Sequence, residues 1–226
     1  MDLGLAQQVV VVVGGEGYLG SAIASRLRAE GARVVVAART TETGVRLDAR
    51  DPDSVRAGIA AIAAREGRID ALVVAAAPSA RTLDPARNSD PAQVLDAIDG
   101  KAMAFLRLAN AALPLMVAAG SGRIVGISGQ NALVTGNLTG SVRNAALIVA
   151  AKNLADQVAG SGVTVNVVNP GIVADNPSTT VETGRGGESS PTQIADLVAF
   201  LASPLASGIS GESIAIGHRV RGVVAL

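Results

Sequence analysis

Cysteine and tryptophan are absent from this 226-residue sequence, and its few aromatic residues are Tyr18, Phe105 and Phe200. The lack of cysteine excludes disulfide bonds and thiol catalysis. With so few aromatic side chains, the core must consist of valine, leucine, isoleucine and alanine, which supply most of the 49% hydrophobic content. A chain of this length and composition suits one α/β domain with a sizeable core.

The sequence also has no excess of charge of either sign, because its 19 basic residues balance its 19 acidic ones. No basic run is present, so a nucleic-acid partner is not expected. The N-terminus carries Asp2 and no basic segment, and its apolar run is too short for a signal peptide or a membrane span. We therefore expect a cytoplasmic protein with a small-molecule ligand, no membrane association and no metal site.

A glycine-rich turn after a run of five valines organises the N-terminal part of the chain. Val9–Val13 predicts a strand buried on both faces, and a helical pattern follows the turn. In such a strand–turn–helix unit, Gly14 allows the tight turn, Gly17 lets backbone approach a pyrophosphate, and Gly20 lets the helix pack closely. The phosphates would lie at the helix N-terminus. The unit predicts a dinucleotide site, although a purely structural turn would show the same pattern.

The rest of the chain alternates between strand and helix patterns. Further strands are predicted at Arg33–Ala38, Val45–Leu47, Ile69–Ala77, Arg123–Ile127, Val163–Val168 and Ser213–Ile216, and further helices at Asp51–Arg65, Asp90–Ala119, Leu138–Ala159 and Pro191–Ala202. This order predicts a single doubly wound Rossmann-type domain over residues 1–226, with a parallel sheet of about seven strands and helices on both faces. The polar segment Asp175–Ser190 is predicted to be a mobile substrate lid.

Taken in order, these segments resemble the short-chain dehydrogenase/reductase family over nearly the whole chain. The matching pieces are Gly14–Gly20, Asp70–Ala77, Gly122–Val125, Val163–Asn166, Asn169–Gly171 and Ala199–Glu212. The glycine spacing Gly14-x-x-Gly17-x-x-Gly20 looks like the family's extended form, whereas the rest looks like its short form. The resemblance implies a nicotinamide-dependent oxidoreductase fold that forms a homodimer or homotetramer. Two long helices that are apolar beyond one face agree with such pairing.

The family's catalytic residues are a tyrosine, a lysine four residues later, a serine and an asparagine. The resemblance places Gly140, Asn144, Gly129 and Lys101, respectively, at these positions. The chain's one tyrosine, Tyr18, lies in the glycine turn, so a small shift of alignment does not restore the acid. The catalytic residues are therefore unknown, with Lys101, Ser128 and Asn144 as candidates. Lys101 and Asn144 look like a reciprocal exchange of the family's asparagine and lysine, which would keep a cation at the site. The alternative is a coincidence in which Lys101 is a solvated lysine. Ser128 substitutes for the serine only if its strand has already ended.

The cofactor half of the pattern is better preserved. Ala38 stands where NAD-dependent members would carry an acid, and Arg39, which follows it, fits a 2′-phosphate. This favours NADP over NAD, although Glu16 argues mildly against so much negative charge. Asp48 either contacts adenine or caps a strand end. Asp175 replaces a threonine near the nicotinamide amide, and His218 lies either on the surface or in a neighbouring subunit's pocket. The predicted cofactor-binding residues are Gly14, Gly17, Tyr18, Leu19, Gly20, Arg39, Asp48, Ala75, Ala76, Ala77, Pro170, Gly171 and Ile172.

Three functions fit these observations. The first is an NAD(P)-binding, oxidoreductase-type protein with a degenerate active site, which is not expected to carry out standard ketone or alcohol redox chemistry. The second is a non-catalytic binding protein or partner subunit. The third is a non-redox elimination or isomerisation with Lys101 or Asp175 as base. The fold alone does not choose among them.

Overall fold

A computed structural model describes residues 2–78 and 82–223, and its main sheet has seven strands that all run parallel. In spatial order the strands are β3 (Val45–Arg46), β2 (Arg33–Ala38), β1 (Val9–Val13), β4 (Ala71–Val74), β5 (Gly122–Ile127), β6 (Val163–Pro170) and β9 (Ser213–Ile216). The predicted doubly wound fold is therefore confirmed. In such a sheet, ligands bind outside the carboxyl ends of the strands where the strand order reverses.

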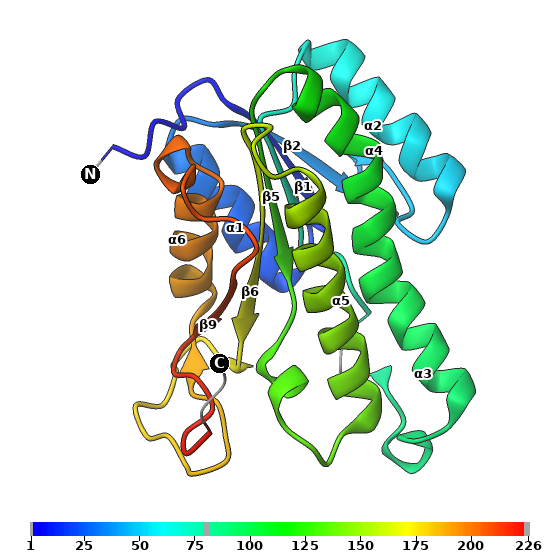
Figure 1. The fold of residues 1–226 in the computed structure, drawn as a ribbon, viewed down its shortest axis with the longest axis vertical. Helices are drawn as coiled ribbons and strands as arrows, with labels where there is room; N and C mark the ends of the chain where they lie inside the picture. The colour runs from blue at the N-terminus through cyan, green and yellow to red at the C-terminus, as the bar shows by residue number, and fades with distance from the viewer. Residues whose placement is uncertain (1, 79–81, 224–226) are drawn as a thin grey trace.

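Helices cover both faces of this sheet (Figure 1). One layer contains α1 (Tyr18–Ala29) and α6 (Pro191–Leu201), and the other contains α2 (Pro52–Glu66), α4 (Ala104–Ala118) and α5 (Leu138–Gln157). Alternate valines of β1 belong to the two resulting core clusters, so the strand is buried on both sides. This arrangement explains why five consecutive valines form a strand without a polar face.

The ends of several elements differ from the sequence-based predictions. β4 covers only Ala71–Val74, whereas a strand over Ile69–Ala77 was expected. The Asp70 carboxylate accepts a hydrogen bond from the Val9 amide at 2.7 Å, and Ala75–Ala77 leave the sheet as a loop. β6 continues to Pro170, because Asn169 and Pro170 still pair with β9. The alanines therefore lie at the ligand-binding edge rather than inside the sheet.

The predicted helix over Asp90–Ala119 is present but is not uniform. It consists of α3 (Pro91–Ile98), the π-helical segment η3 (Asp99–Met103) and α4, and the Asp90 side chain caps its start. Within the described residues, Pro91–Ala118 is the one helical stretch with the length and apolarity of a membrane span, and half of its most apolar window is buried in the fold. π-Helical turns widen a helix and are frequent at functional sites. Here the wide turn contains Lys101.

The C-terminal end of the predicted lid, Asp175–Ser190, pairs with the strand that precedes the lid. β7 (Ile172–Val173) pairs in parallel with β8 (Glu188–Ser189), and Thr183 forms a bridge with Arg221. The chain between the two short strands forms a loop beside the C-terminal segment (Figure 1). The described residues also include the short 3-10 helices η2 (Pro85–Arg87), η4 (Gln130–Leu133) and η5 (Pro204–Ala206).

Candidate active site

A cleft of about 690 Å³ opens at the carboxyl ends of β1, β2 and β4. Of the predicted cofactor-binding residues, Gly14, Gly17, Arg39, Asp48 and Ala75–Ala77 line it. Tyr18, Leu19 and Gly20 instead form the first turn of α1, and Pro170, Gly171 and Ile172 lie at the end of β6 and the start of β7. The cleft is also lined by residues that sequence reasoning did not assign to it, including Arg50, Pro78 and Gly100.

The glycine turn is shaped by close backbone contacts. Gly14 has φ +82°, and a Cβ there would lie 2.7 Å from the Ala76 amide nitrogen. A Cβ on Gly20 would lie 2.0 Å from the Gly14 carbonyl oxygen. Gly17 is the N-cap of α1, and a Cβ there would meet only the Gly14 oxygen, at 3.3 Å. Gly14 and Gly20 are thus required by the fold, whereas Gly17 leaves the approach to the helix N-terminus open.

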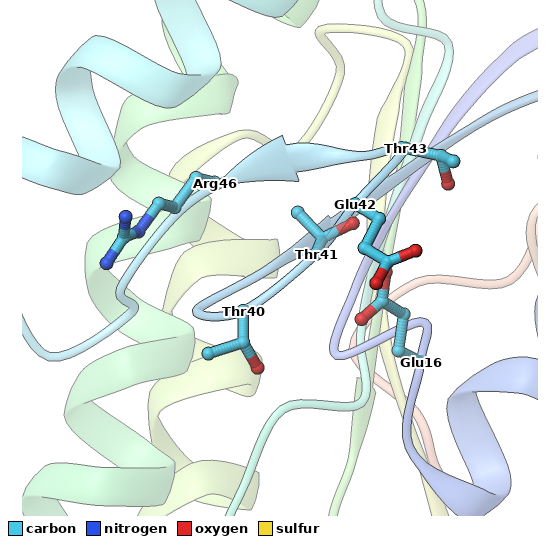
Figure 2. A pocket seen from close by; sticks show the side chains of 6 residues that line it. All are labelled: Glu16, Thr40, Thr41, Glu42, Thr43 and Arg46. Atoms are coloured by element: carbon cyan, nitrogen blue, oxygen red, sulfur yellow. The ribbon is translucent and has the colours of Figure 1, made fainter.

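A second pocket of about 680 Å³ adjoins this cleft and shares Glu16 and Thr40 with it. Figure 2 shows the carboxylates of Glu16 and Glu42 on one side of this pocket and the guanidinium of Arg46 on the other. Arg39 is exposed and lines the adjoining cleft. The outer end of the cleft therefore carries both basic and acidic side chains.

Two predicted site residues from distant parts of the chain make direct contact. The Tyr18 hydroxyl donates a hydrogen bond to the Asp175 carboxylate at 2.5 Å. This contact joins the first turn of α1 to the segment that follows β7. Both side chains are exposed. Sequence reasoning placed both residues near the cofactor but did not predict the contact, because no local pattern links positions so far apart.

The three candidate catalytic residues are gathered in one buried cluster. The ammonium of Lys101 donates to the Ser128 carbonyl oxygen at 3.0 Å, and the Ser128 hydroxyl donates to the Asn144 carbonyl oxygen at 2.9 Å. β5 ends at Ile127, so Ser128 does follow the end of its strand. Its hydroxyl is nevertheless held by the backbone of α5. Lys101 is buried, so the alternative of a solvated lysine is wrong.

Gly140 and Gly129, which the resemblance predicts at the positions of the family's tyrosine and serine, carry no side chain. The Gly140 amide donates to Asn137 Oδ1 at 2.9 Å, as part of the N-terminal cap of α5. A Cβ on Gly129 would lie 3.1 Å from the side-chain nitrogen Nδ2 of Asn144, so the Asn144 side chain faces this position. Asn144 Oδ1 is buried and has no hydrogen-bond partner among the described residues.

Sequence reasoning missed Arg143, which precedes Asn144 on α5. Its side chain is buried, and its guanidinium donates to the Pro78 carbonyl oxygen at 3.1 Å. Burial, followed by the nearby positive charge of Arg143, lowers the pKa of Lys101 to about 7, and burial also lowers the pKa of Arg143. The sequence shows that Arg143 is next to Asn144, the residue predicted at the family's lysine position, but it does not show that the Arg143 side chain is buried.

Two remaining predictions concern Asp48 and His218. Asp48 lines the cleft, and its carboxylate accepts a hydrogen bond from the Arg50 amide at 2.9 Å. His218 is exposed, and its backbone oxygen accepts from Gln130 at 2.9 Å. In the described part of the chain, no three His, Asp or Glu side chains are grouped so as to hold a metal ion.

The fold, the glycine turn and the cleft together define a Rossmann-type protein, and comparison with known proteins identifies the family. Residues 16–218 match the family model described as "Enoyl-(Acyl carrier protein) reductase". The chain belongs to the short-chain dehydrogenase/reductase family.

Individual relatives cover nearly the whole chain. It is 31% identical to the 3-oxoacyl-(acyl-carrier-protein) reductase FabG of Salmonella typhimurium, over 92% of this chain and 94% of that protein. It is 32% identical to the cis-4-hydroxycyclohexanecarboxylate dehydrogenase of Sinomonas cyclohexanicum, over 96% of this chain and 97% of that protein. The solved structure of Cj0485 dehydrogenase superposes with a TM-score of 0.85 over 100% of this chain and 99% of that one, at 20% identity. That identity level supports the fold alone.

Proposed function

We propose that this protein binds a nicotinamide dinucleotide, NADP(H) rather than NAD(H), without carrying out standard ketone or alcohol redox chemistry. The first half of the proposal is supported by the cleft of about 690 Å³ at the end of the glycine turn, with Arg39 at its outer edge. The short-chain dehydrogenase/reductase relatives include reductases and a dehydrogenase by their names. A small-molecule ligand would occupy the inner end of the cleft, near Lys101.

The observation that carries the second half is the absence of side chains at Gly140 and Gly129. Reduction of a carbonyl develops negative charge on its oxygen, which needs a proton donor and a hydrogen-bond donor. General acid catalysis is typically worth ~10²–10⁴-fold, and one oxyanion donor roughly 10²–10³-fold. The hydroxyl of Ser128 donates to the Asn144 carbonyl instead of facing a ligand. We therefore propose an atypical member of the family.

A second candidate function is a non-redox elimination or isomerisation with Lys101 as base. The observation that favours it is the buried amine of Lys101, whose pKa is lowered to about 7. An amine with this pKa is partly unprotonated at neutral pH and can take up a proton. Asp175, the other base considered, is less suitable because it is exposed and already accepts a hydrogen bond from Tyr18.

Titration of the protein with NADPH and NADH, followed by nicotinamide fluorescence, tests the proposal. Binding of NADPH without reduction of small ketones such as cyclohexanone supports it. Binding together with ordinary enzymatic turnover of ketones contradicts the degenerate site. Failure of both dinucleotides to bind contradicts the cofactor assignment and favours a non-catalytic scaffold or partner subunit.

Arg39→Ala is expected to weaken NADPH binding more than NADH binding. A guanidinium forms charge-assisted hydrogen bonds to the 2′-phosphate, which only NADPH carries. A loss of about tenfold for NADPH corresponds to about 1.4 kcal/mol, within the range of one charged hydrogen bond. Fluorescence titration of both cofactors measures the ratio, and equal losses would remove the argument for NADP.

The two acidic residues of the second pocket, Glu16 and Glu42, provide the matched control. Glu16→Gln and Glu42→Gln each remove a negative charge from the pocket in Figure 2 while keeping the size of the side chain. Both variants are expected to strengthen NADPH binding and to leave NADH binding nearly unchanged. An increase that is equal for both cofactors would show that the carboxylates act on the shared phosphates instead.

We also propose a homodimer or homotetramer that pairs through α4 and α5. These helices fill the core and still expose large apolar side chains: Leu115 and Val117 on α4, and Leu138, Val142 and Val149 on α5. Pairing would bury these side chains and is expected at micromolar concentration. Sedimentation velocity of the purified protein checks this, and a single monomer species at that concentration would contradict it.

The segment Asp175–Ser190 is proposed as the substrate lid. Its start is held by the Tyr18–Asp175 hydrogen bond, and its end by the pairing of β7 with β8. Between these two attachments, Thr183 is bridged to Arg221. Closure over a ligand would have to carry this contact along or break it, but it would not break the main sheet. The Tyr18 contact would then link the position of the lid to the cofactor turn.

A further inference from the structure

Two buried basic side chains, those of Lys101 and Arg143, lie beside the inner end of the cleft. Lys101 has 6% and Arg143 has 5% of its surface exposed. Each makes a single hydrogen bond to a neutral backbone carbonyl, of Ser128 and Pro78 respectively. Arg143 Nε is buried without a partner, and no ion pair joins either side chain to a carboxylate in residues 2–78 or 82–223. Buried charges are normally paired, because an isolated one is costly.

These charges lie beside the cleft rather than deep in the core. Gly100 and Pro78 are lining residues of the cleft. Lys101 directly follows Gly100 in the π-helical turn, and Arg143 is hydrogen-bonded to Pro78. A Cβ on Gly100 would lie 2.8 Å from the Pro78 side chain, so the two elements touch at this point. The cluster is therefore adjacent to the space that the proposed function assigns to the small-molecule ligand.

The free N–H donors of Lys101 and Arg143 suit an anion that has several acceptor oxygens. A lysine ammonium has three N–H donors and an arginine guanidinium has five, and neither has an acceptor. Only one donor of each is used within the described residues. Carboxylates and phosphates accept several such bonds, and a guanidinium can bind them in a bidentate manner. Glu16 and Asp48 line the cleft, and Glu42 lines the second pocket. Among the described residues, none of these three carboxylates forms an ion pair with Lys101 or Arg143.

We propose that Lys101 and Arg143 form a binding site for the carboxylate or phosphate group of an anionic substrate. This inference deepens the proposed function, because it rests on the same cleft and names the class of ligand at its inner end. The anion would neutralise the two charges and fill the unused donor positions. The Asn144 Oδ1 lacks a partner among the described residues and would accept a hydrogen bond from a hydroxyl or protonated group of the same ligand.

Calorimetric titration with oxalate and with inorganic phosphate tests the site, using protein saturated with NADPH. Oxamide, the neutral diamide of oxalate, controls for shape. Wild type is expected to bind at least one of the two anions and not oxamide. Arg143→Gln is expected to weaken anion binding at least tenfold, and Arg143→Lys, which keeps the charge, to weaken it less. Lys152→Gln removes an exposed cation from the same helix and should leave binding unchanged.

Several outcomes would overturn the site. These are failure of wild type to bind either anion, equal binding of oxamide, or an unchanged affinity in Arg143→Gln. Anion binding that disappears on saturation with NADPH would also overturn it, because the site would then belong to the cofactor's phosphates. If Arg143→Gln does not fold, Lys101→Met carries the same expectation. Should NADPH itself not bind, titration of the free protein still tests the anion site, so the inference and the proposed function can fail separately.

Discussion

The variant Lys101→Asn/Gly129→Ser/Gly140→Tyr/Asn144→Lys is expected to reduce small ketones with NADPH at least ~10³-fold faster than wild type. It restores a phenol acid, the lysine that lowers the phenol's pKa, and a hydroxyl that donates to the substrate oxygen. The expected gain follows from the typical worth of an acid and of an oxyanion donor. Single substitutions should do little, because such groups act as a unit.

The structure can accept these side chains. Gly140 has no positive φ, and the atoms nearest to a Cβ there belong to the flexible Asn137 side chain, at 2.9 Å, which would have to move. Displacing Asn137 costs about 1 kcal/mol, the usual worth of a helix cap. The Lys101→Asn change is needed because lysines at 101 and 144 would otherwise stand beside Arg143 as three cations in a buried region.

Steady-state oxidation of NADPH, recorded by absorbance with cyclohexanone as substrate, measures the gain. The triple variant that retains Lys101 is the matched control, and it should gain less because of charge repulsion. Ordinary turnover of ketones by the unmodified protein would show that the alignment of these four positions, or the chemistry assigned to them, is wrong. A folded, NADPH-binding quadruple variant without any gain would show that the substrate is not held near Gly140.

The main features of the fold were predictable because they depend on local patterns. The run Val9–Val13 has no polar face and therefore indicates a strand covered on both sides, as observed. The edges of elements were less predictable, since they depend on long-range pairing. β6 extends to Pro170 because β9 lies beside it, and Ala75–Ala77 leave the sheet where β1 ends.

The candidate site was predictable only in part. The resemblance to the family directed attention to Lys101 and Asn144, which the structure joins through Ser128. Arg143 was missed because α5 is apolar on more than one face, so the sequence does not show which of its residues are buried. The contact between Tyr18 and Asp175 depends on the path that the chain takes after β6, through β7, back to the first turn of α1. The sequence therefore predicts which residues belong to the site, whereas their burial, contacts and electrostatics become visible only in the tertiary structure.

The largest expected effect on stability concerns the pH dependence caused by Lys101. Its pKa in the folded protein is lowered to about 7, against an ordinary value of 10.5, mainly by burial. Between these two pH values the unfolded chain holds a proton that the folded chain does not. The free energy of unfolding should therefore rise with pH across this window, by up to about 1.4 kcal/mol per pH unit. Below about pH 7 both states are protonated, so the full cost of burying the charge is present and this contribution no longer changes.

Lys101→Met is expected to abolish this rise and to be more stable than wild type near pH 6. Methionine replaces a buried, unpaired cation with an apolar side chain of similar length, and such replacements are often stabilising. Urea unfolding at one fixed protein concentration, from pH 6 to pH 9, measures the difference between the two proteins. Lys152→Met, at an exposed position on α5, should run parallel to wild type over the same range. Parallel curves for Lys101→Met and wild type would instead mean that the buried amine keeps its ordinary pKa, because another group or bound ion compensates its charge.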